Sequence, residues 1–390
     1  MSSFLSFFYI YDPWLFHFIR MAFIMGAIAI GVLCYKGINN KLPQGIQLPV
    51  DSLVVSLLLI VISLFPIIIH SSTDFSVIKM YFKGFLLFIC GIAVYNLVYL
   101  NKDKSALIKD LKLGISVQAV IGFLALLGLP IIIDLALSTN AVYPRFYGSE
   151  QEYRLYNLTS SGFFQLSIFY LMLLNFILAY DRKYNTIHGI YILMILFIGL
   201  ISGRTFLALS VLSILFYFRF KYLPYLILFL AICLLFTFFF NEHKYVRHAL
   251  EPLINFFYGY GNISSSTDTL VEKHLFKPEL RQILIGDGYY YGYYGSTDSG
   301  FLRQFLYGGI LYMLSCFLFM FYFIRKIALN WFDGSWRFML SSLVILSVLN
   351  IKADAYAFPG IMTLFLMFLS LFGRSGKRIT LFKPQRGSNV

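Results

Sequence analysis

The chain has 390 residues, of which 59% are hydrophobic and only 13% are charged, and its formal net charge is +13. A soluble domain carries about 25% charged residues, so this composition excludes a soluble fold and indicates a protein that crosses a membrane many times. Most lysines stand in short loops between apolar runs, which is how membrane proteins are oriented, so the positive charge does not indicate nucleic-acid binding.

Apolar runs long enough to cross a bilayer recur along the whole chain. About 20 apolar residues span a membrane as a helix. The sequence predicts eleven such spans, at 17–36, 53–70, 77–100, 113–136, 163–180, 187–203, 205–220, 222–240, 301–324, 337–351 and 356–373. Residues 4–15 are interrupted by Asp12 and Pro13, and we expect them to lie in the membrane interface. We therefore expect residues 1–390 to form a single all-α bundle of about 11–12 transmembrane helices.

Short basic loops set the expected orientation. They lie at 101–112, 181–183, 219–221, 325–326 and 373–378. The positive-inside rule predicts that these loops and the C-terminus face the cytoplasm. An odd number of spans then puts the N-terminus outside, unless a further short helix makes the number even. No basic segment or cleavage site marks a removable leader, so the first span is expected to act as its own signal.

The outer side carries two enlarged loops, at 137–162 and 241–300. Loops longer than about 15 residues are usually functional or disordered, and the many tyrosines in both loops argue against disorder. The stretch "GDGYYYGYYGSTDSG" combines aromatic rings with Gly, Asp and Ser, which is typical of surfaces that bind sugars. An aromatic belt at the membrane interface has a similar composition. Tyr290 and Tyr294 are the candidate sugar-binding residues in this stretch.

Basic residues on the outer side need an explanation, because the positive-inside rule predicts few of them. Arg204 stands in the turn of "LISGRTFLALS", at a membrane depth where an arginine costs about 2.5–3.5 kcal/mol. Its guanidinium could bind pyrophosphate oxygens through two hydrogen bonds, or it could be an ordinary turn arginine that reaches to the interface. The two loops add further candidates for substrate binding that could equally be solvated: Arg145, Arg154, Arg247, Lys273 and Arg281.

The stretch "GSTDSGFLRQFLYGGILY" places an acid and an arginine where an apolar run begins. Asp298 could cap the N-terminus of the following helix, or it could act as a general base that takes a proton from a hydroxyl. Arg303 would then face inward a turn later. The glycine pair in "YGGILY" is expected to let a neighbouring helix or a substrate approach closely. Lys352 and Asp354, at the last outer turn, could form a simple interface pair.

Metal and nucleotide sites are not indicated. The apolar runs contain all four cysteines without a C-x-x-C pair, and the outer loops contain His243, His248 and His274 without a partner at ligand spacing. The chain has no P-loop motif and no carboxylate cluster suited to a divalent cation. We therefore expect no metal or other cofactor, and we expect arginines to contact any phosphate.

Two stretches together resemble the O-antigen polymerases (Wzy-type), within the superfamily that includes the O-antigen ligases. "SGRTFLALSVLSIL" resembles the family's arginine at the outer end of a helix. "IGDGYYYGYYGSTDSGFLRQFLYGGILY" resembles its G-x-G, variable span, polar catalytic-site residue and helix with a glycine pair. The layout of helices and enlarged loops resembles the family over the whole chain. The chain departs from the pattern at Asp298-Ser299, where ligases typically have a histidine-containing pair.

A second departure concerns the arginine that the family usually carries some 15–20 residues before G-x-G. In this chain only Lys273 is basic there, and Arg247 or Arg281 could substitute for the missing arginine. The change at Asp298 favours a polymerase over a ligase.

The resemblance implies a GT-C-like helical fold in the bacterial inner membrane, with the active site facing the periplasm and the C-terminus in the cytoplasm. The implied reaction is a metal-independent, inverting glycosyl transfer. A glycan on undecaprenyl pyrophosphate would be the donor, and a sugar hydroxyl of a new lipid-linked repeat unit would be the acceptor. A chain-length regulator and a flippase of the same pathway would be partners, in addition to membrane lipid.

The resemblance also assigns roles. Arg204, with Arg303 or a loop arginine second, would meet the charge that develops on the leaving pyrophosphate. Asp298 would activate the acceptor hydroxyl, which requires a buried carboxyl because a solvated carboxylate is a weak base. Three alternatives remain open: a ligase, a transporter and a purely structural membrane subunit, the last of which would not need arginines at membrane depth. An O-antigen ligase would pass the glycan to a lipid A core, and a flippase or other transporter would show repeat symmetry and short outer loops.

Overall fold

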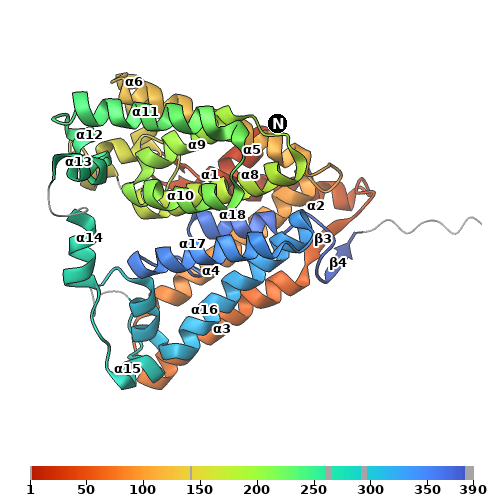
Figure 1. The fold of residues 1–390 in the computed structure, drawn as a ribbon. Coiled ribbons are helices and arrows are strands. Elements are labelled where there is room, and N and C mark those ends of the chain that lie inside the picture. Colours follow the sequence, from red (N-terminus) through yellow and green to blue (C-terminus); the bar gives the residue numbers. More distant parts are fainter. Residues whose placement is uncertain (1, 141–142, 260–264, 291–296, 383–390) are drawn as a thin grey trace, which may run out of the picture.

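The computed structural model describes residues 2–140, 143–259, 265–290 and 297–382, and most of these residues are in helices (Figure 1). Within the described residues, six helices are long and apolar enough to cross a membrane. They are Met21–Ile38 (α2), Val50–His70 (α3), Ser76–Val98 (α4), Phe163–Tyr184 (α8), Phe220–Phe239, which combines η2 (Phe220–Tyr222) and α11 (Leu223–Phe239), and Gly300–Phe332 (α16). The prediction of an all-α membrane bundle is confirmed.

The other predicted spans coincide with helices that are shorter or more polar. These are α5 (Ser105–Leu126), α9 (Gly189–Ser202), α10 (Arg204–Tyr217), α17 (Trp336–Lys352) and α18 (Ile361–Leu369).

The span predicted at 113–136 has the wrong bounds. Helix α5 begins inside the basic stretch that was expected to be a loop, and it ends at Leu126. Gly128 then adopts a left-handed conformation with φ of +82°, and Pro130 starts the separate helix α6 (Pro130–Ser138). Glycine favours this conformation, and proline favours the first turn of a helix. Together these two residues explain the break.

Helix α8 lies at the centre of the bundle, and most of its residues are buried. It contacts α9 and α10 on one side and α16, α17 and α18 on the other. In Figure 1, α5, α6, α9, α10 and α11 form the upper group of helices, and α3, α4, α16 and α17 form the lower group. Helix α8 carries apolar side chains on every face, and a helix of this kind is stable only when neighbouring helices cover it.

The stretch 4–15, predicted for the membrane interface, mostly forms a helix that packs against other helices of the bundle. Helix α1 (Ser2–Tyr11) is packed inside the bundle against α2, α4, α5 and α18. The carboxylate of Asp12, which interrupts the apolar pattern, is buried in an ion pair with Arg20 and accepts a hydrogen bond from the backbone N–H of Ala22 at 2.9 Å. A buried charge is tolerated when it is paired and hydrogen-bonded in this way.

Both chain ends lie at one end of the bundle (Figure 1). Ser3 donates a hydrogen bond to Asp110 near the start of α5. The C-terminal strand β4 (Arg378–Leu381) pairs antiparallel with β3 (Ile46–Pro49). Helix α1 adds a short helix before the first predicted span, which is the alternative that brings the two chain ends to the same side. A second small hairpin joins β1 (Trp14–Leu15) to β2 (Ile19–Arg20).

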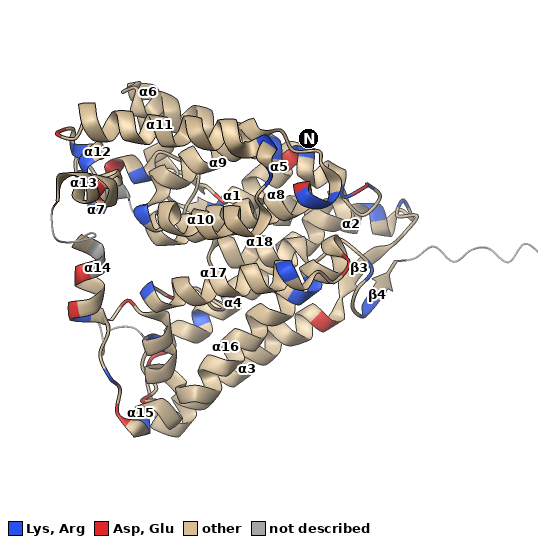
Figure 2. Cartoon of the chain, in the orientation of Figure 1, with Lys and Arg blue, Asp and Glu red and all other residues tan. Residues whose placement is uncertain are grey.

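Short helices occupy the two stretches that were predicted as enlarged loops. Between α6 and α8 lie α7 (Tyr143–Phe146) and the 3₁₀ helix η1 (Glu152–Leu155). Between α11 and α16 lie α12 (Lys244–Ala249), α13 (Glu251–Tyr258), α14 (Ser265–Thr269), the π-helical turn η3 (Leu270–His274) and α15 (Leu280–Ile285). Figure 2 shows that charged residues stand mostly at the two ends of the bundle. The end that carries these short helices is called the loop end below, and the end that carries the chain termini is called the terminal end.

Candidate functional site

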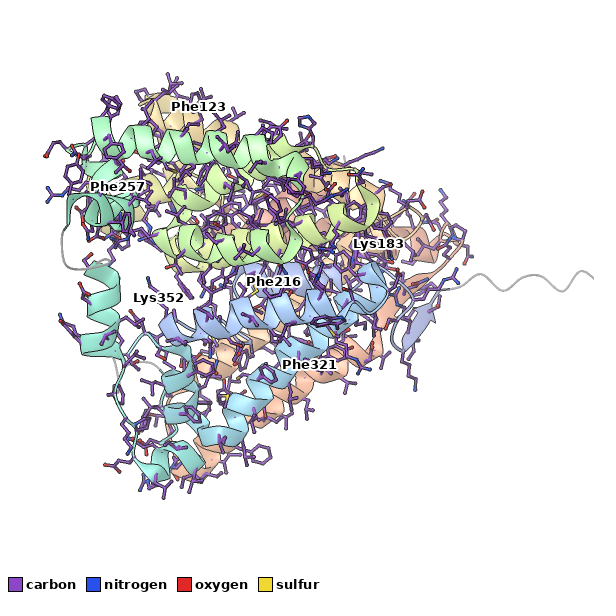
Figure 3. All side chains as sticks on the ribbon, in the orientation of Figure 1. Phe123, Lys183, Phe216, Phe257, Phe321 and Lys352 are labelled. Carbon is purple, nitrogen blue, oxygen red and sulfur yellow. The ribbon has the colours of Figure 1, made fainter. Side chains whose placement is uncertain are left out.

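Three positively charged side chains that are distant in sequence gather at the loop end. Arg154 comes from η1, Arg204 is the first residue of α10, and Lys352 is the last residue of α17. Lys352 lies within electrostatic reach of both arginines. Figure 3 shows Lys352 at the end of α17, at the end of the bundle away from Lys183. The sequence predicted the two arginines as candidates but not the lysine.

Arg154 is held almost entirely by neutral groups. Its Nε donates to the carbonyl oxygen of Ser202 at 3.1 Å, and its guanidinium lies over the ring of Phe163, 4.3 Å from the centroid. A side chain at Gly203 would collide with Nη2 of Arg154, because a Cβ there would lie 2.8 Å away. The "SG" before Arg204 therefore lets the two arginines approach. Burial, with the nearby charge of Arg204 adding to it, lowers the pKa of Arg154 to about 10, so it remains charged near neutral pH.

Arg204 forms an ion pair with Glu251, the first residue of α13, and both side chains are mostly buried. Glu251 also accepts a hydrogen bond from the backbone N–H of Ser265 at 3.0 Å, which is the start of α14. Arg204 therefore fixes the short helices of the second stretch onto the bundle.

Lys352 and Asp354 do not form the interface pair that was predicted. Lys352 donates to Thr205 Oγ1 at 3.0 Å, on the first turn of α10. Asp354 is buried and accepts a hydrogen bond from Gln304 Nε2 at 2.9 Å. Burial raises the pKa of Asp354 well above its ordinary value, so it does not offer Lys352 a charged partner at neutral pH. The two side chains diverge because α17 ends between them and the chain becomes extended.

Asp298 lies immediately before α16 but does not cap it. The helix begins at Gly300, and Ser299 occupies the N-cap position without a side-chain capping hydrogen bond. Arg303 turns back to Asp298, with Nη2 3.2 Å from Oδ1. The backbone N–H of Asp298 donates to Nδ1 of His274 at 3.1 Å, and the other ring nitrogen lies 3.5 Å from Oδ2. The Asp298 side chain is 60% exposed, so the burial expected of a general base is not found.

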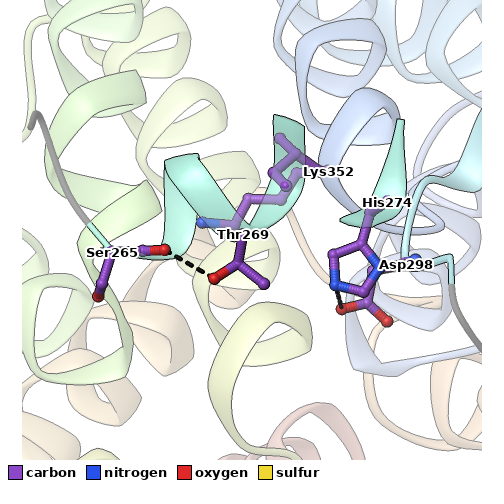
Figure 4. Close-up of a pocket in the computed structure, with 6 residues that line it drawn as sticks. Ser265, Thr269, His274, Asp298 and Lys352 are labelled. Carbon is purple, nitrogen blue, oxygen red and sulfur yellow. Dashed lines mark hydrogen bonds and ion pairs between the residues drawn. The ribbon is translucent and has the colours of Figure 1, made fainter. Parts of the chain in front are cut away.

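A cavity of about 230 Å³ joins the acidic and the basic groups (Figure 4). Asp298, His274 and Lys352 line it, together with residues of α14 and η3, which are Ser265, Thr269 and Leu270. Arg204 and Arg154 lie within electrostatic reach of Lys352 and add to the positive potential. The cavity thus presents a carboxylate and an imidazole on one wall and an ammonium group on another. Such a site could hold an anion beside a hydroxyl that gives up its proton.

The remaining predicted site residues do not line this cavity in the described part of the chain. Arg145, Arg247 and Lys273 are exposed, and Arg281 pairs with Asp287 at 3.1 Å. Tyr290 is buried away from solvent and donates its backbone N–H to Asp74 at 2.8 Å. Tyr294 lies outside the described residues.

The G-x-G at 286–288 packs against the glycine pair of α16. The pair breaks the helix: Gly309 adopts a φ of +68°, and a Cβ there would lie 2.3 Å from the carbonyl oxygen of Leu284. The backbone N–H groups of Asp287 and Gly288 donate to carbonyl oxygens of α16 at 2.7 and 2.9 Å. The predicted close approach of a neighbouring segment is therefore found, although the pair interrupts the helix rather than continuing it.

His248 is another titratable group that lies within electrostatic reach of both arginines. The Nδ1 atom of His248 lies 2.9 Å from the hydroxyl oxygen of Tyr153. Burial lowers the pKa of His248 to about 3, with Arg204 and Arg154 adding to the shift, so it adds no positive charge at neutral pH. Within the described residues, no group of three His, Cys, Asp or Glu side chains could hold a metal ion.

Comparisons of this chain with protein-family models, with curated proteins and with solved structures find no match. The family resemblance of the two sequence stretches therefore stays a prediction.

Proposed function

We propose that this chain is a membrane glycosyltransferase of the O-antigen polymerase type. It would join repeat units carried on undecaprenyl pyrophosphate, at the periplasmic face of a bacterial inner membrane, with its C-terminus in the cytoplasm and a GT-C-like fold. The observation that carries this proposal is the cavity at the loop end, which Asp298 and Lys352 both line, with two arginines within electrostatic reach of the lysine. The resemblance of the stretches around Arg204 and Asp298 supports it.

The reaction at this site would be a single displacement. The acceptor hydroxyl oxygen forms a bond to the anomeric carbon of the donor sugar, and the bond from that carbon to pyrophosphate breaks on the opposite face. The electron pair leaves with undecaprenyl pyrophosphate, and the hydroxyl proton passes to the Asp298 carboxylate. Inversion at the anomeric carbon follows from this geometry.

The cations would stabilise the leaving group. Pyrophosphate gains negative charge as the bond breaks, and preorganised positive groups lower the energy of that state. Arg204 would exchange its ion pair with Glu251 for phosphate oxygens, while Lys352 would contact the group from the cavity side. Arg154, held by neutral partners, would contribute at longer range.

Asp298 would serve as the base, with Arg303 and His274 fixing its orientation. Because the Asp298 side chain is exposed to solvent, the acceptor sugar itself must displace water from the carboxylate. Desolvation by the bound substrate would then strengthen the base at the moment of reaction.

The contact between His274 and Asp298 favours one second candidate, an O-antigen ligase. A histidine-containing pair is typical of ligases in this superfamily, and here the imidazole comes from residue 274. Glycan length distinguishes the two functions. We expect deletion of this chain in its host to leave surface glycan with a single repeat. Complete loss of attached glycan would favour the ligase, and an unchanged length distribution would contradict both.

A further inference from the structure

A second cavity, of about 420 Å³, lies at the terminal end, where α8, α10 and α16 end and α17 begins. Its lining includes Arg182, Lys183 and Arg337, with Asp333 as its carboxylate. Three cations and one carboxylate give this lining a net charge of +2. The proposed glycosyl transfer does not use this cavity.

The two arginines keep most of their hydrogen-bonding capacity. Lys183 is neutralised by Asp333, with Nζ 2.7 Å from the carboxylate, and it also donates to a backbone carbonyl. Arg182 makes a single long hydrogen bond of 3.5 Å to the carbonyl oxygen of Phe216. Within the described residues, Arg337 makes no hydrogen bond or ion pair. Both guanidinium groups lie within electrostatic reach of the buried Tyr217, so the two arginines are near the same part of the cavity.

The first turn of α17 adds donors to this cavity. Ser335 is its N-cap residue and makes no side-chain capping hydrogen bond, so its hydroxyl can donate to a ligand. The first backbone N–H groups of a helix have no partner within the helix, and they favour phosphate. Guanidinium groups bind phosphate oxygens with two hydrogen bonds each.

The surroundings of the cavity are those of a membrane surface. Trp336 is 67% exposed, and tryptophan is favoured where a bilayer meets water. Leu340, one turn further along α17, and Leu215 on α10 are also exposed apolar side chains.

We propose that this cavity binds the phosphate ester headgroup of an anionic membrane lipid. Arg182 and Arg337 hold the phosphate oxygens, Ser335 donates to them, and the acyl chains lie along the exposed leucines of α10 and α17. Basic pockets between helix ends at the cytoplasmic side are known to take anionic lipid headgroups.

The test uses the full chain purified in detergent and freed of lipid, titrated with phosphatidylglycerol and followed by native mass spectrometry. Loss of one charge-assisted contact corresponds to roughly tenfold in affinity. We therefore expect the double variant Arg182→Gln/Arg337→Gln to bind phosphatidylglycerol at least about tenfold more weakly. Arg325→Gln removes one exposed charge near the same end of α16, and we expect it to bind like the unaltered chain.

Three outcomes would overturn the proposal. Phosphatidylcholine, which is zwitterionic, could bind as tightly as phosphatidylglycerol. Inorganic phosphate could displace the lipid at equal concentration, which would make the ligand a free anion. The double variant could also bind phosphatidylglycerol like the unaltered chain. Arg337→Gln alone removes a side chain without a described partner, so the test remains possible if the double variant does not fold.

Discussion

Arg154 and Arg204 bring two guanidinium groups close together at the loop end, and Lys352 approaches them from a third element. Like charges in a partly buried site repel each other, and this repulsion lowers the stability of the folded chain. Glu251 offsets part of it through its ion pair with Arg204. Arg154 is held by a carbonyl oxygen, an amide and an aromatic ring, none of which carries a charge. A bound anion would relieve the remaining repulsion, and this is why we interpret the cluster as a phosphate site.

The role of Lys352 can be tested by removing its charge. We expect Lys352→Gln to lower the rate of chain extension by about 10²-fold, since that is typical for loss of one group that stabilises developing charge. Lys352→Arg should keep part of the activity. Lys277→Gln, an exposed lysine that does not line the cavity, is the matched control for charge and should be unchanged. Equal activity in Lys352→Gln and Lys277→Gln would remove Lys352 from the site.

Arg204 could act on substrate or could only anchor α13, and two variants separate these roles. We expect Arg204→Ala to abolish chain extension at normal protein level, and Arg204→Lys to restore it only in part because lysine lacks the bidentate fork. Glu251→Gln removes the internal partner but leaves the guanidinium, so it should remain active. If Glu251→Gln were as inactive as Arg204→Ala, the arginine would be an anchor.

The sequence alone indicates only some of the residues of the candidate site. Arg204 could be found because a charge interrupts a long apolar run on the side where basic residues are rare. Lys352 gives the same signal, a lysine at the outer end of an apolar helix, but the nearby Asp354 suggested an ordinary pair. His274 was interpreted only as a loop histidine, because its contact with Asp298 depends on how the 23 residues between them fold.

Helix α16 is interrupted at Gly308 and Gly309, and its sequence only partly indicates this break. The glycine pair predicted close packing, and α15 does approach it, but the left-handed conformation of Gly309 follows from that contact rather than from the pair itself. Element boundaries elsewhere show the same limit. The start of α5 was placed too late because its first turns carry lysines, although α5 itself continues through them.

Replacing Gly309 with alanine tests this packing. The added Cβ would collide with the backbone of α15 and would force a strained φ, and overpacking of this kind costs about 1–3 kcal/mol. We expect Gly309→Ala to lower the thermal unfolding midpoint. Gly31→Ala, inside α2 with nothing within 4 Å of the new Cβ, should leave the midpoint unchanged or raise it, since alanine favours helix. Equal thermal unfolding midpoints for the two variants would show that close packing of α15 at Gly309 does not contribute to stability.

The whole molecule is a helical bundle with two chemically different ends. The composition and the apolar runs were enough to predict this class, because a chain with so few charges must be covered by lipid or by its own helices. They were not enough to place the N-terminus, because α1 is short and contains no run that could span a bilayer alone. Its stability comes from burial against four other helices, which no local pattern reveals.

Cysteine labelling in intact cells tests the orientation of the bundle. In a Cys34→Ser background, which removes the exposed cysteine, we expect Lys277→Cys to react with a membrane-impermeant reagent. Arg374→Cys and an N-terminal tag should both be protected until the membrane is opened. Labelling of Arg374→Cys in intact cells would reverse the orientation, and opposite results for the two chain ends would contradict the position of α1.

The central claim is most directly tested by the length distribution of glycan made from a synthetic undecaprenyl-pyrophosphate repeat unit by the purified protein. We predict a ladder of products from the unaltered chain without added metal. We also predict that Asp298→Asn, which cannot take up the hydroxyl proton, extends the chain about 10²–10⁴-fold more slowly. Because Asp298 is largely exposed and does not cap α16, this variant should fold normally. A single-repeat product from the unaltered chain, or an unchanged ladder from Asp298→Asn, would contradict the proposed polymerase site.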